Sequence, residues 1–190
     1  MPSKARTSRA ETVSDADRLK ALVRTISDFP EPGIKFRDVT TLLLDPFGLN
    51  AAVESMAATV EEPVDLVAAI DARGFAIGGA LAVRIGAGLL LVRKGGKLPG
   101  VTIAEDYALE YGKDRLELHA DACAPGARVL IVDDLIATGG TALAAVRLVR
   151  RTGAIPVGAR FLIDLPDLGG TKALQAAGVE AISLMAFQGS

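Results

Sequence analysis

The chain has 190 residues, of which half are apolar and 23% are charged, and its formal net charge is −2 at neutral pH. This length and balance predict a folded domain with a packed core, and the small net charge excludes a strong field for attracting nucleic acid. The single cysteine, Cys123, excludes an internal disulfide and fits a reducing compartment. No apolar run approaches the ~18 residues of a membrane span, so we expect a cytoplasmic protein that binds neither nucleic acid nor membrane.

The first residues, 1–12, are basic at their start and lack an apolar core, so we expect a disordered tail rather than a secretory signal. The remaining residues, 13–190, are expected to form a single domain. A helix is predicted from Ser14, which suits an N-cap, with apolar residues at helical spacing through Ile26. The run Phe-Pro-Glu-Pro-Gly at 29–33 then predicts a loop.

Helical and strand-like segments alternate along the rest of the chain. Asp45-Pro46 suits the N-cap and first residue of a helix that runs toward Val60. Further strands are expected at 66–70, 88–92, 116–119, 129–132, 155–163 and 179–184, and further helices at 74–85, after Gly140, and at 170–177. This alternation predicts an α/β fold with a mostly parallel sheet. The polar, glycine-rich segment 93–109 is expected to be a functional loop without regular structure.

The most informative stretch is 129–142. Four apolar residues predict a strand buried on both faces, Asp133 and Asp134 follow at its C-terminal end, and a Thr-Gly-Gly-Thr loop leads into an amphipathic helix. In an open α/β sheet, ligands bind at this end of the strands, and loop amides and a helix N-terminus favour an anion. Carboxylates beside such a loop indicate a ligand with both hydroxyls and phosphates, such as a phosphorylated ribose.

Other common nucleotide-binding and catalytic patterns are missing from the sequence. There is no Gly-x-x-x-x-Gly-Lys-Ser/Thr loop, and no Gly-x-Gly-x-x-Gly follows a strand. The lone His119 cannot supply a multi-histidine metal site. With one histidine and one cysteine in the chain, a Ser-His-Asp or Cys-His triad has no support.

The order buried strand, Asp-Asp, apolar pair, Ala-Thr-Gly-Gly-Thr resembles the phosphoribosyl-pyrophosphate (PRPP) signature of the type I phosphoribosyltransferases. Three more motifs, in family order, are similar to segments of the adenine-specific members. These are a base-binding segment at 29–38, a pyrophosphate loop at 71–75 and a mobile catalytic loop at 93–112. Thr41 departs from the pattern, because relatives commonly have proline there, and we expect it to alter local stiffness rather than chemistry.

The resemblance implies a central, mostly parallel sheet flanked by helices, with a small base-binding hood and a flexible catalytic loop. It implies transfer from PRPP to adenine, giving AMP and pyrophosphate in purine salvage, and a homodimer, with which the mean hydropathy of +0.36 is consistent. The alternatives are a hypoxanthine or guanine enzyme and a non-catalytic regulator that senses PRPP. Residues 184–190 offer no lysine of the kind that contacts a 6-oxo group, and too few residues precede the family segment for a DNA-binding domain.

The resemblance also assigns the site residues. PRPP and AMP would bind Asp133, Asp134, Ala137, Thr138, Gly139, Gly140 and Thr141. Pyrophosphate would bind Asp71, Ala72, Arg73, Lys94 and Lys97, with a non-proline cis peptide near Asp71-Ala72. Adenine would stack on Phe36 and meet the main chain at Lys35, Phe36 and Arg37. Glu110 would be the general acid or base, on a loop that also holds Tyr107 and Tyr111 and closes over PRPP.

Mg²⁺ is expected as a cofactor because pyrophosphate is highly charged. We expect PRPP and water to hold it, with no direct protein ligand and with Asp133 and Asp134 nearby. Without the resemblance, periodicity would favour Phe36 as a core residue, and Glu110 would be a surface acid. Lys94 and Lys97 would be solvated lysines or phosphate ligands, since their glycine-rich loop has no acidic partners in the sequence, and Cys123 would be an inert small side chain.

Overall fold

The computed structural model describes residues 14–108 and 113–189, and every structural statement below concerns these residues. The expected tail at 1–12 lies outside them, as do Glu110 and Tyr111. Within the described ranges, no helix is both long and apolar enough to cross a membrane.

The larger of two sheets has seven strands: β3 (Leu66–Ile70), β4 (Gly88–Lys94), β5 (Thr102–Ala108), β6 (Lys113–His119), β7 (Arg128–Ile136), β8 (Ile155–Asp164) and β9 (Ala181–Ala186). Their spatial order is β5-β6-β4-β3-β7-β8-β9. Neighbours from β4 to β9 run parallel, whereas β6 is antiparallel to both β4 and β5. The mostly parallel sheet predicted from the sequence is therefore confirmed.

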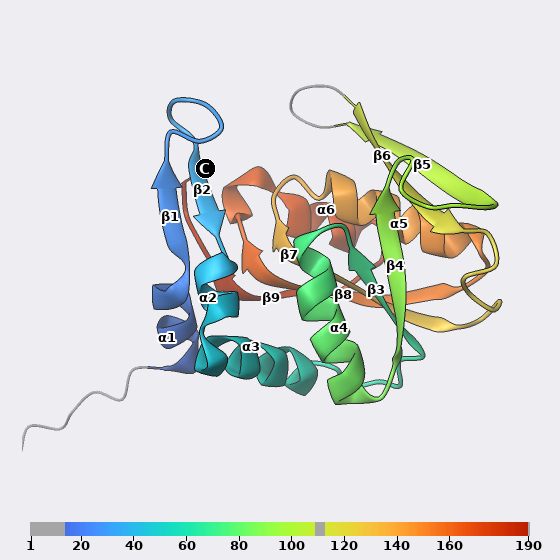
Figure 1. The fold of residues 1–190 in the computed structure, drawn as a ribbon, viewed down its shortest axis with the longest axis horizontal. Helices are drawn as coiled ribbons and strands as arrows, with labels where there is room; N and C mark the ends of the chain where they lie inside the picture. Colours follow the sequence, from blue (N-terminus) through green and yellow to red (C-terminus); the bar gives the residue numbers. More distant parts are fainter. Residues whose placement is uncertain (1–13, 109–112, 190) are drawn as a thin grey trace, which may run out of the picture.

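The smaller sheet pairs β1 (Arg24–Ser27) antiparallel with β2 (Lys35–Asp38). We call residues 24–38 the hood. It stands beside the short helices α1 (Asp15–Leu22) and α2 (Thr40–Leu44). Figure 1 shows the hood and the β5–β6 hairpin on opposite flanks of the edge at which the parallel strands end. These two flanks therefore enclose the place where an open α/β sheet binds its ligand.

Helices cover both faces of the larger sheet. On one face lie α3 (Pro46–Ala58) and α4 (Arg73–Ile85), and on the other lie α5 (Gly140–Arg151) and α6 (Gly170–Ala176), which follows the short 3₁₀ helix η1 (Pro166–Leu168). Along β7, Val129 and Ile131 pack with α5, while Leu130 and Val132 pack with α4. The strand is thus buried on both faces, as predicted, and burial of each such side chain contributes about 1.5–3 kcal/mol.

The first helix is shorter than the sequence pattern predicts. Ser14 caps it, since its hydroxyl oxygen accepts from the backbone N–H of Asp17, but the helix ends at Leu22. Ile26 lies in β1 opposite Phe36, so its assignment to the helix was wrong. Thr25 and Ile26 are β-branched and favour a strand once β2 supplies a partner, which outweighs the helical spacing of Ile26.

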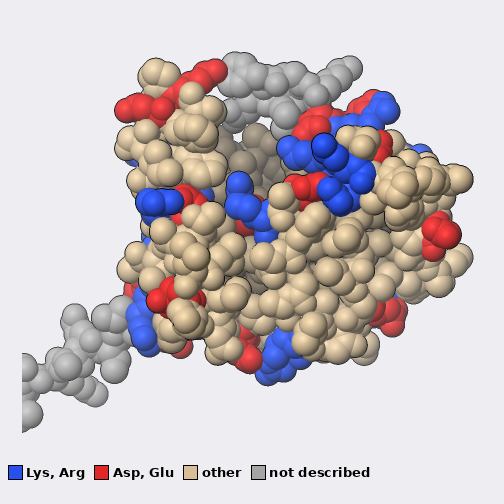
Figure 2. All heavy atoms as spheres, viewed as in Figure 1, with Lys and Arg blue, Asp and Glu red and all other residues tan. Residues whose placement is uncertain are grey.

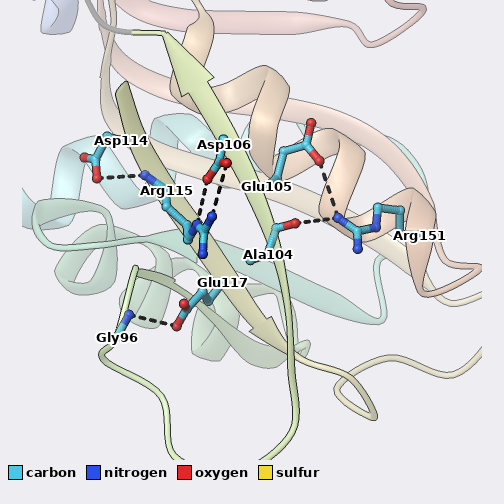
Figure 3. A network of polar contacts seen from close by, with 8 residues as sticks. All are labelled: Gly96, Ala104, Glu105, Asp106, Asp114, Arg115, Glu117 and Arg151. Carbon is cyan, nitrogen blue, oxygen red and sulfur yellow. Dashed lines mark hydrogen bonds and ion pairs between the residues drawn. The ribbon is translucent and has the colours of Figure 1, made fainter. Parts of the chain in front are cut away.

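The segment 93–109 is also more regular than expected. Its first residues complete β4, and residues 102–108 form β5, so the expectation of a structureless loop was wrong. Ile103 and Tyr107 pack in the apolar core between the larger sheet and α5. Glu105 pairs with Arg147 and Arg151 of α5 at 3.2 and 3.4 Å. Figure 3 shows the Arg151 contacts. Because the charged Glu105 lies between the inward-facing Ile103 and Tyr107, the sequence of β5 does not show the alternating apolar pattern of a strand.

Two further elements differ from the sequence expectation. Strand β7 continues through Asp133 and Asp134 to Ile136, so the acids lie within the strand rather than after it. Helix α2 was not expected. Thr41, at the position where proline is common in relatives, donates its hydroxyl to the backbone oxygen of Leu22 at 2.5 Å. This bond ties α2 to the end of α1.

Candidate active site

A cavity of about 450 Å³ lies at the carboxyl edge of the sheet. Its lining is Asp71, Ala72, Arg73, Lys94, Tyr107, Asp114, Asp133, Asp134 and Thr141. All of these except Asp114 were expected at the site from the sequence. Figure 2 shows a hollow between the hood and the hairpin side of the molecule, where acidic and basic side chains gather.

The two adjacent acids of β7 have different surroundings. Asp134 is 4% exposed, and its Oδ2 accepts from Arg73 Nε at 2.5 Å. Asp133 Oδ1 accepts from the backbone N–H of Asp134 at 2.9 Å. Burial, together with the neighbouring Asp134 carboxylate, raises the pKa of Asp133 well above its ordinary value. The pair therefore holds negative charge that the protein alone neutralises only in part.

The Thr-Gly-Gly-Thr turn leads from β7 into α5, as predicted. Gly139 has φ of +82°, and a Cβ there would come within 3.0 Å of the backbone of Gly170. The turn is held against α6, because Ala137 O accepts from Gly170 N at 2.9 Å. Thr141 lines the cavity, residues 137–139 form the turn beside it, and Gly140 begins α5. Helix α5 therefore presents its positive N-terminal end at the cavity.

Acidic partners engage the basic residues on the side of the cavity where the sequence resemblance implies pyrophosphate binding. The peptide bond between Asp71 and Ala72 is cis, as the resemblance implies. Asp71 Oδ2 accepts from Arg93 Nε at 2.8 Å, and Lys94 Nζ lies 3.3 Å from Asp114 Oδ2. The expectation that Lys94 has no acidic partner was therefore wrong, because the β4–β6 pairing brings Asp114 to it. Lys97 is exposed and lies outside the cavity lining.

Asp114 is the site residue that sequence reasoning missed. It lies on β6, directly opposite Tyr107 of β5 in the strand register. Tyr107 donates its hydroxyl to Asp114 Oδ2 at 3.0 Å, and burial raises the pKa of Tyr107 to about 12. No local motif marks Asp114. Its place at the cavity follows from a hairpin register that the sequence pattern did not reveal.

The hood presents Phe36 toward the cavity side. The Phe36 ring is half-buried and meets Phe29 edge-to-face, with centroids 5.3 Å apart and an interplanar angle of 78°. The Arg73 guanidinium lies 5.5 Å from the Phe36 ring centroid. A half-buried ring next to a cavity-lining arginine is not part of the buried core, so the assignment of Phe36 to the core on periodicity alone was wrong.

The side chain of Arg37 points away from the cavity. Its guanidinium lies 4.7 Å from the Phe187 ring centroid, and it donates to Thr25 Oγ1 and to the backbone oxygens of Gln188 and Gly189. Arg37 therefore fastens the hood to the C-terminal segment. Lys35 is exposed, and neither Lys35 nor Arg37 is among the residues that line the cavity.

A satisfied carboxylate anchors the base of the hood. Asp38 is 6% exposed, accepts from the backbone N–H of Thr40 at 2.9 Å, and is paired with Arg24. Hydrogen bonds from Thr40 and Arg24 lower the pKa of Asp38 to about 2. The hood thus rests on an acid whose charge is compensated within the protein.

The described residues contain no group of three or more His, Cys, Asp or Glu side chains arranged to hold a metal ion. The cavity instead offers separate carboxylates directly after β3, on β6 and on β7. That donor set fits a hydrated Mg²⁺ carried by substrate phosphates, since this ion commonly keeps several waters and uses few protein ligands.

A parallel sheet that ends in paired acids and a glycine turn, faced by a cavity with basic side chains, is the arrangement expected of a phosphoribosyltransferase. In agreement, the family described as "Phosphoribosyl transferase domain" matches residues 48–173. The chain belongs to the phosphoribosyltransferase family.

Similar proteins narrow this assignment. An adenine phosphoribosyltransferase of Sphingopyxis alaskensis is 56% identical over 90% of this chain and 94% of its own length. The crystal structure of the Thermoanaerobacter pseudethanolicus enzyme of the same name superimposes with a TM-score of 0.87 at 47% identity, covering 90% of this chain and 99% of that one. A Trypanosoma brucei structure of that name, in complex with AMP, pyrophosphate and ribose-5-phosphate, gives 0.81 at 28% identity, covering 92% and 82%. Within the family, the chain belongs with the adenine phosphoribosyltransferases.

Proposed function

We propose that this chain transfers the phosphoribosyl group of PRPP to adenine, giving AMP and pyrophosphate, as a step in purine salvage. The observation that carries the proposal is the cavity itself. It has Asp133, Asp134 and Thr141 on the sheet side, and Arg73 extends from it to the ring of Phe36. The names of the relatives and the ligands of the Trypanosoma brucei structure support this choice of substrates.

The sugar phosphate is assigned to the turn at 137–141. Backbone N–H groups and the hydroxyls of Thr138 and Thr141 donate there, and the N-terminus of α5 adds a field worth up to ~2 kcal/mol in a partly buried geometry. Asp133 and Asp134 accept from the ribose hydroxyls, since ionised carboxylates only accept. Hydroxyl donors from the ribose would supply the compensation that Asp133 lacks in the protein alone.

The reaction breaks the bond between the anomeric carbon and pyrophosphate, and the electron pair leaves with pyrophosphate. Positive charge develops on the ribose ring, as in glycoside chemistry, close to the two carboxylates of β7. A bond then forms from the anomeric carbon to a ring nitrogen of adenine, which loses its proton. We assign proton handling at the imidazole edge to Glu110, which lies outside the described residues.

Pyrophosphate is assigned to the side of the cavity formed by Asp71, Ala72, Arg73 and Lys94, with Lys97 nearby in sequence. When bound, Mg²⁺ neutralises the phosphate charge, and we propose that PRPP and water hold it with Asp133 and Asp134 nearby. Omission of Mg²⁺ from a calorimetric titration should abolish PRPP binding. Undiminished binding in excess chelator would contradict this role of the ion.

Adenine is assigned to the hood, stacked on Phe36 and read by the main chain at 35–37. Adenine offers a 6-amino donor and an N1 acceptor, whereas hypoxanthine presents the reverse pair. A peptide unit that matches adenine leaves buried polar groups unpaired when hypoxanthine enters, which can lower kcat/KM by ~10⁴-fold or more.

A spectrophotometric assay with PRPP, Mg²⁺ and each of adenine, hypoxanthine and guanine tests the proposal. We expect rapid AMP formation from adenine and a strong preference over both 6-oxo purines. Comparable turnover of hypoxanthine would replace the proposal by the hypoxanthine-guanine alternative. PRPP binding without turnover of any purine would instead favour a regulator.

We also propose a homodimer formed through α4 and β4. Val83 of α4 is 84% exposed, and Leu89 and Leu91 of β4 are 46% and 40% exposed. A Cβ at Gly79 would lie 3.8 Å from Leu89, so one apolar surface continues from the helix to the strand. Such a surface suits a self-complementary interface between two copies.

Sedimentation velocity tests the dimer. Val83→Asp should shift the protein toward the monomer, whereas Val101→Asp, at a position that is 80% exposed and outside this surface, should not. If neither variant shifts toward the monomer, the dimer does not form through α4 and β4. We further propose a cytoplasmic location, supported by Cys123, which is free and buried and has a thiol pKa raised by burial.

A further inference from the structure

Asp114 lines the cavity but has no part in the proposed chemistry. It is the second residue of β6, and it lines the side of the cavity assigned to pyrophosphate. A carboxylate in this place repels the anion that the cavity is proposed to bind. Its position therefore calls for an explanation other than direct contact with pyrophosphate.

Two neutral donors hold the Asp114 carboxylate in place. Its Oδ1 accepts from the backbone N–H of Arg115 at 2.8 Å, as Figure 3 shows, and its Oδ2 accepts from the hydroxyl of Tyr107 at 3.0 Å. Tyr107 is 6% exposed, and its pKa of about 12 keeps the hydroxyl protonated at neutral pH. Asp114 is thus fixed by the hairpin itself and does not depend on Lys94 for its orientation.

Lys94 is the adaptable member of its pair with Asp114. Its side chain is 55% exposed, whereas that of Asp114 is 26% exposed, and the two charged groups are 3.3 Å apart. An exposed ammonium on a flexible stem can turn from a carboxylate to a phosphate without moving the backbone. The two anions therefore compete for one cation.

The other basic residues beside the cavity are engaged differently. Arg73 pairs with Asp134, and Arg93 pairs with Asp71. A bound ribose can compensate Asp134 with hydroxyl donors, but pyrophosphate has no donor to offer Asp114 once Lys94 leaves it. Binding of pyrophosphate at Lys94 thus leaves Asp114 with the donors from Tyr107 and Arg115 alone.

We propose that Asp114 is a positioning residue that weakens the hold of Lys94 on pyrophosphate and so favours release of this product. The inference rests on the proposed function, because that function puts pyrophosphate in the cavity. Exposed ion pairs are individually weak, so the effect on pyrophosphate affinity should be about three- to fivefold. A purely structural role for Asp114 predicts the opposite sign, since damage to the hairpin would weaken binding.

Calorimetric titration of pyrophosphate with Mg²⁺ into the full chain tests this inference. Asp114→Asn removes the charge and keeps an oxygen for the Tyr107 hydroxyl, and we expect it to bind pyrophosphate about three- to fivefold more tightly than wild type. In a Lys94→Met background the same substitution should have little effect. Asp121→Asn, in the exposed turn after β6, removes one negative charge elsewhere and should leave the affinity unchanged.

The outcomes separate the two proposals. Wild type that binds pyrophosphate and turns over adenine, with Asp114→Asn binding equally or more weakly, overturns the role of Asp114 alone. A gain in affinity that persists in Lys94→Met also overturns it, because the effect then does not pass through Lys94. If Asp114→Asn does not fold, Asp114→Ala is measured by the same criteria. Absence of both binding and turnover in wild type overturns the proposed function together with this inference.

Discussion

Two carboxylates, one in the hood and one at the edge of the larger sheet, have opposite electrostatic surroundings. In the hood, hydrogen bonds from Thr40 and Arg24 lower the pKa of Asp38 to about 2. At the sheet edge, burial and the charge of Asp134 raise the pKa of Asp133. The protein alone satisfies the first acid and leaves the second in need of a partner. The comparison indicates that Asp38 stabilises the fold, and it agrees with the proposal that Asp133 binds a ligand that brings its own donors.

The largest effect on activity is expected from Glu110 rather than from Asp38 or Asp133. Substitution of Glu110 should slow the chemical step without weakening substrate binding. Glu110→Ala should lower kcat by ~10²–10⁴-fold, the usual contribution of a general acid or base, and change PRPP affinity little. Steady-state kinetics with a parallel PRPP titration measure this. Wild-type kcat in the variant would show that proton transfer at adenine does not use Glu110.

A smaller effect is expected from substitution of Phe36, and it should be limited to binding of the adenine base. Phe36→Ala removes the ring proposed to stack on adenine, and stacking is worth about 1–3 kcal/mol per base. The KM for adenine should therefore rise roughly tenfold, while PRPP affinity stays near that of wild type. Phe36→Tyr keeps the ring and is the matched control. A loss of PRPP affinity equal to the loss for adenine would contradict the division between hood and sheet edge.

The comparison of the two acids also predicts opposite effects on stability. Because the pKa of Asp133 is raised in the folded state, its ionised form destabilises the fold at neutral pH. Asp133→Asn should raise Tm by about 2–4 °C, which corresponds to about 1 kcal/mol in a chain of this size. The gain should shrink as pH falls through the raised pKa, because wild type then becomes protonated. Thermal melts across pH give the answer, and a lowered Tm at pH 7 would contradict it.

Asp38→Asn should act in the other direction and by a smaller amount. The folded pKa of about 2 lies below the ordinary value of 3.8, so the stability that Asp38 contributes is full above about pH 4 and is lost as pH falls toward 2. We expect a loss of under about 1 kcal/mol at neutral pH, since Arg24 is half exposed. Urea unfolding at pH 7 and pH 2.5 measures it, and an equal loss at both values would exclude ionisation as the cause.

The sequence predicted those parts of the site whose signals are local. The run from Val129 to Thr141 carries strand, acids, turn and helix start within a few residues, and the structure brings Asp133, Asp134 and Thr141 to one cavity. The cis peptide at Asp71-Ala72 came from the family resemblance and is present. The fold class followed from alternating strand and helix patterns in the same way.

The rest depended on contacts between distant segments. Asp114 reaches Lys94 only through the pairing of β4 with β6, and no local pattern encodes that register. Glu105 interrupts the apolar alternation of β5 because its partners are arginines of α5, far along the chain. Ile26 fits the helical spacing, but it lies in β1, where it pairs with Phe36 of β2. The structural roles of Asp114, Glu105 and Ile26 are therefore set by pairing between segments that are distant in the sequence.

The proposed function depends most directly on binding of the PRPP ribose by Asp133 and Asp134. Calorimetric titration of PRPP with Mg²⁺ into wild type, Asp133→Asn and Asp134→Asn tests that claim. An amide reproduces only part of the accepting capacity of a carboxylate, and hydrogen bonds to charged groups are worth about 1.5–3 kcal/mol, so PRPP affinity should fall by roughly 10- to 100-fold in each variant. Unchanged PRPP affinity in both variants would contradict the account.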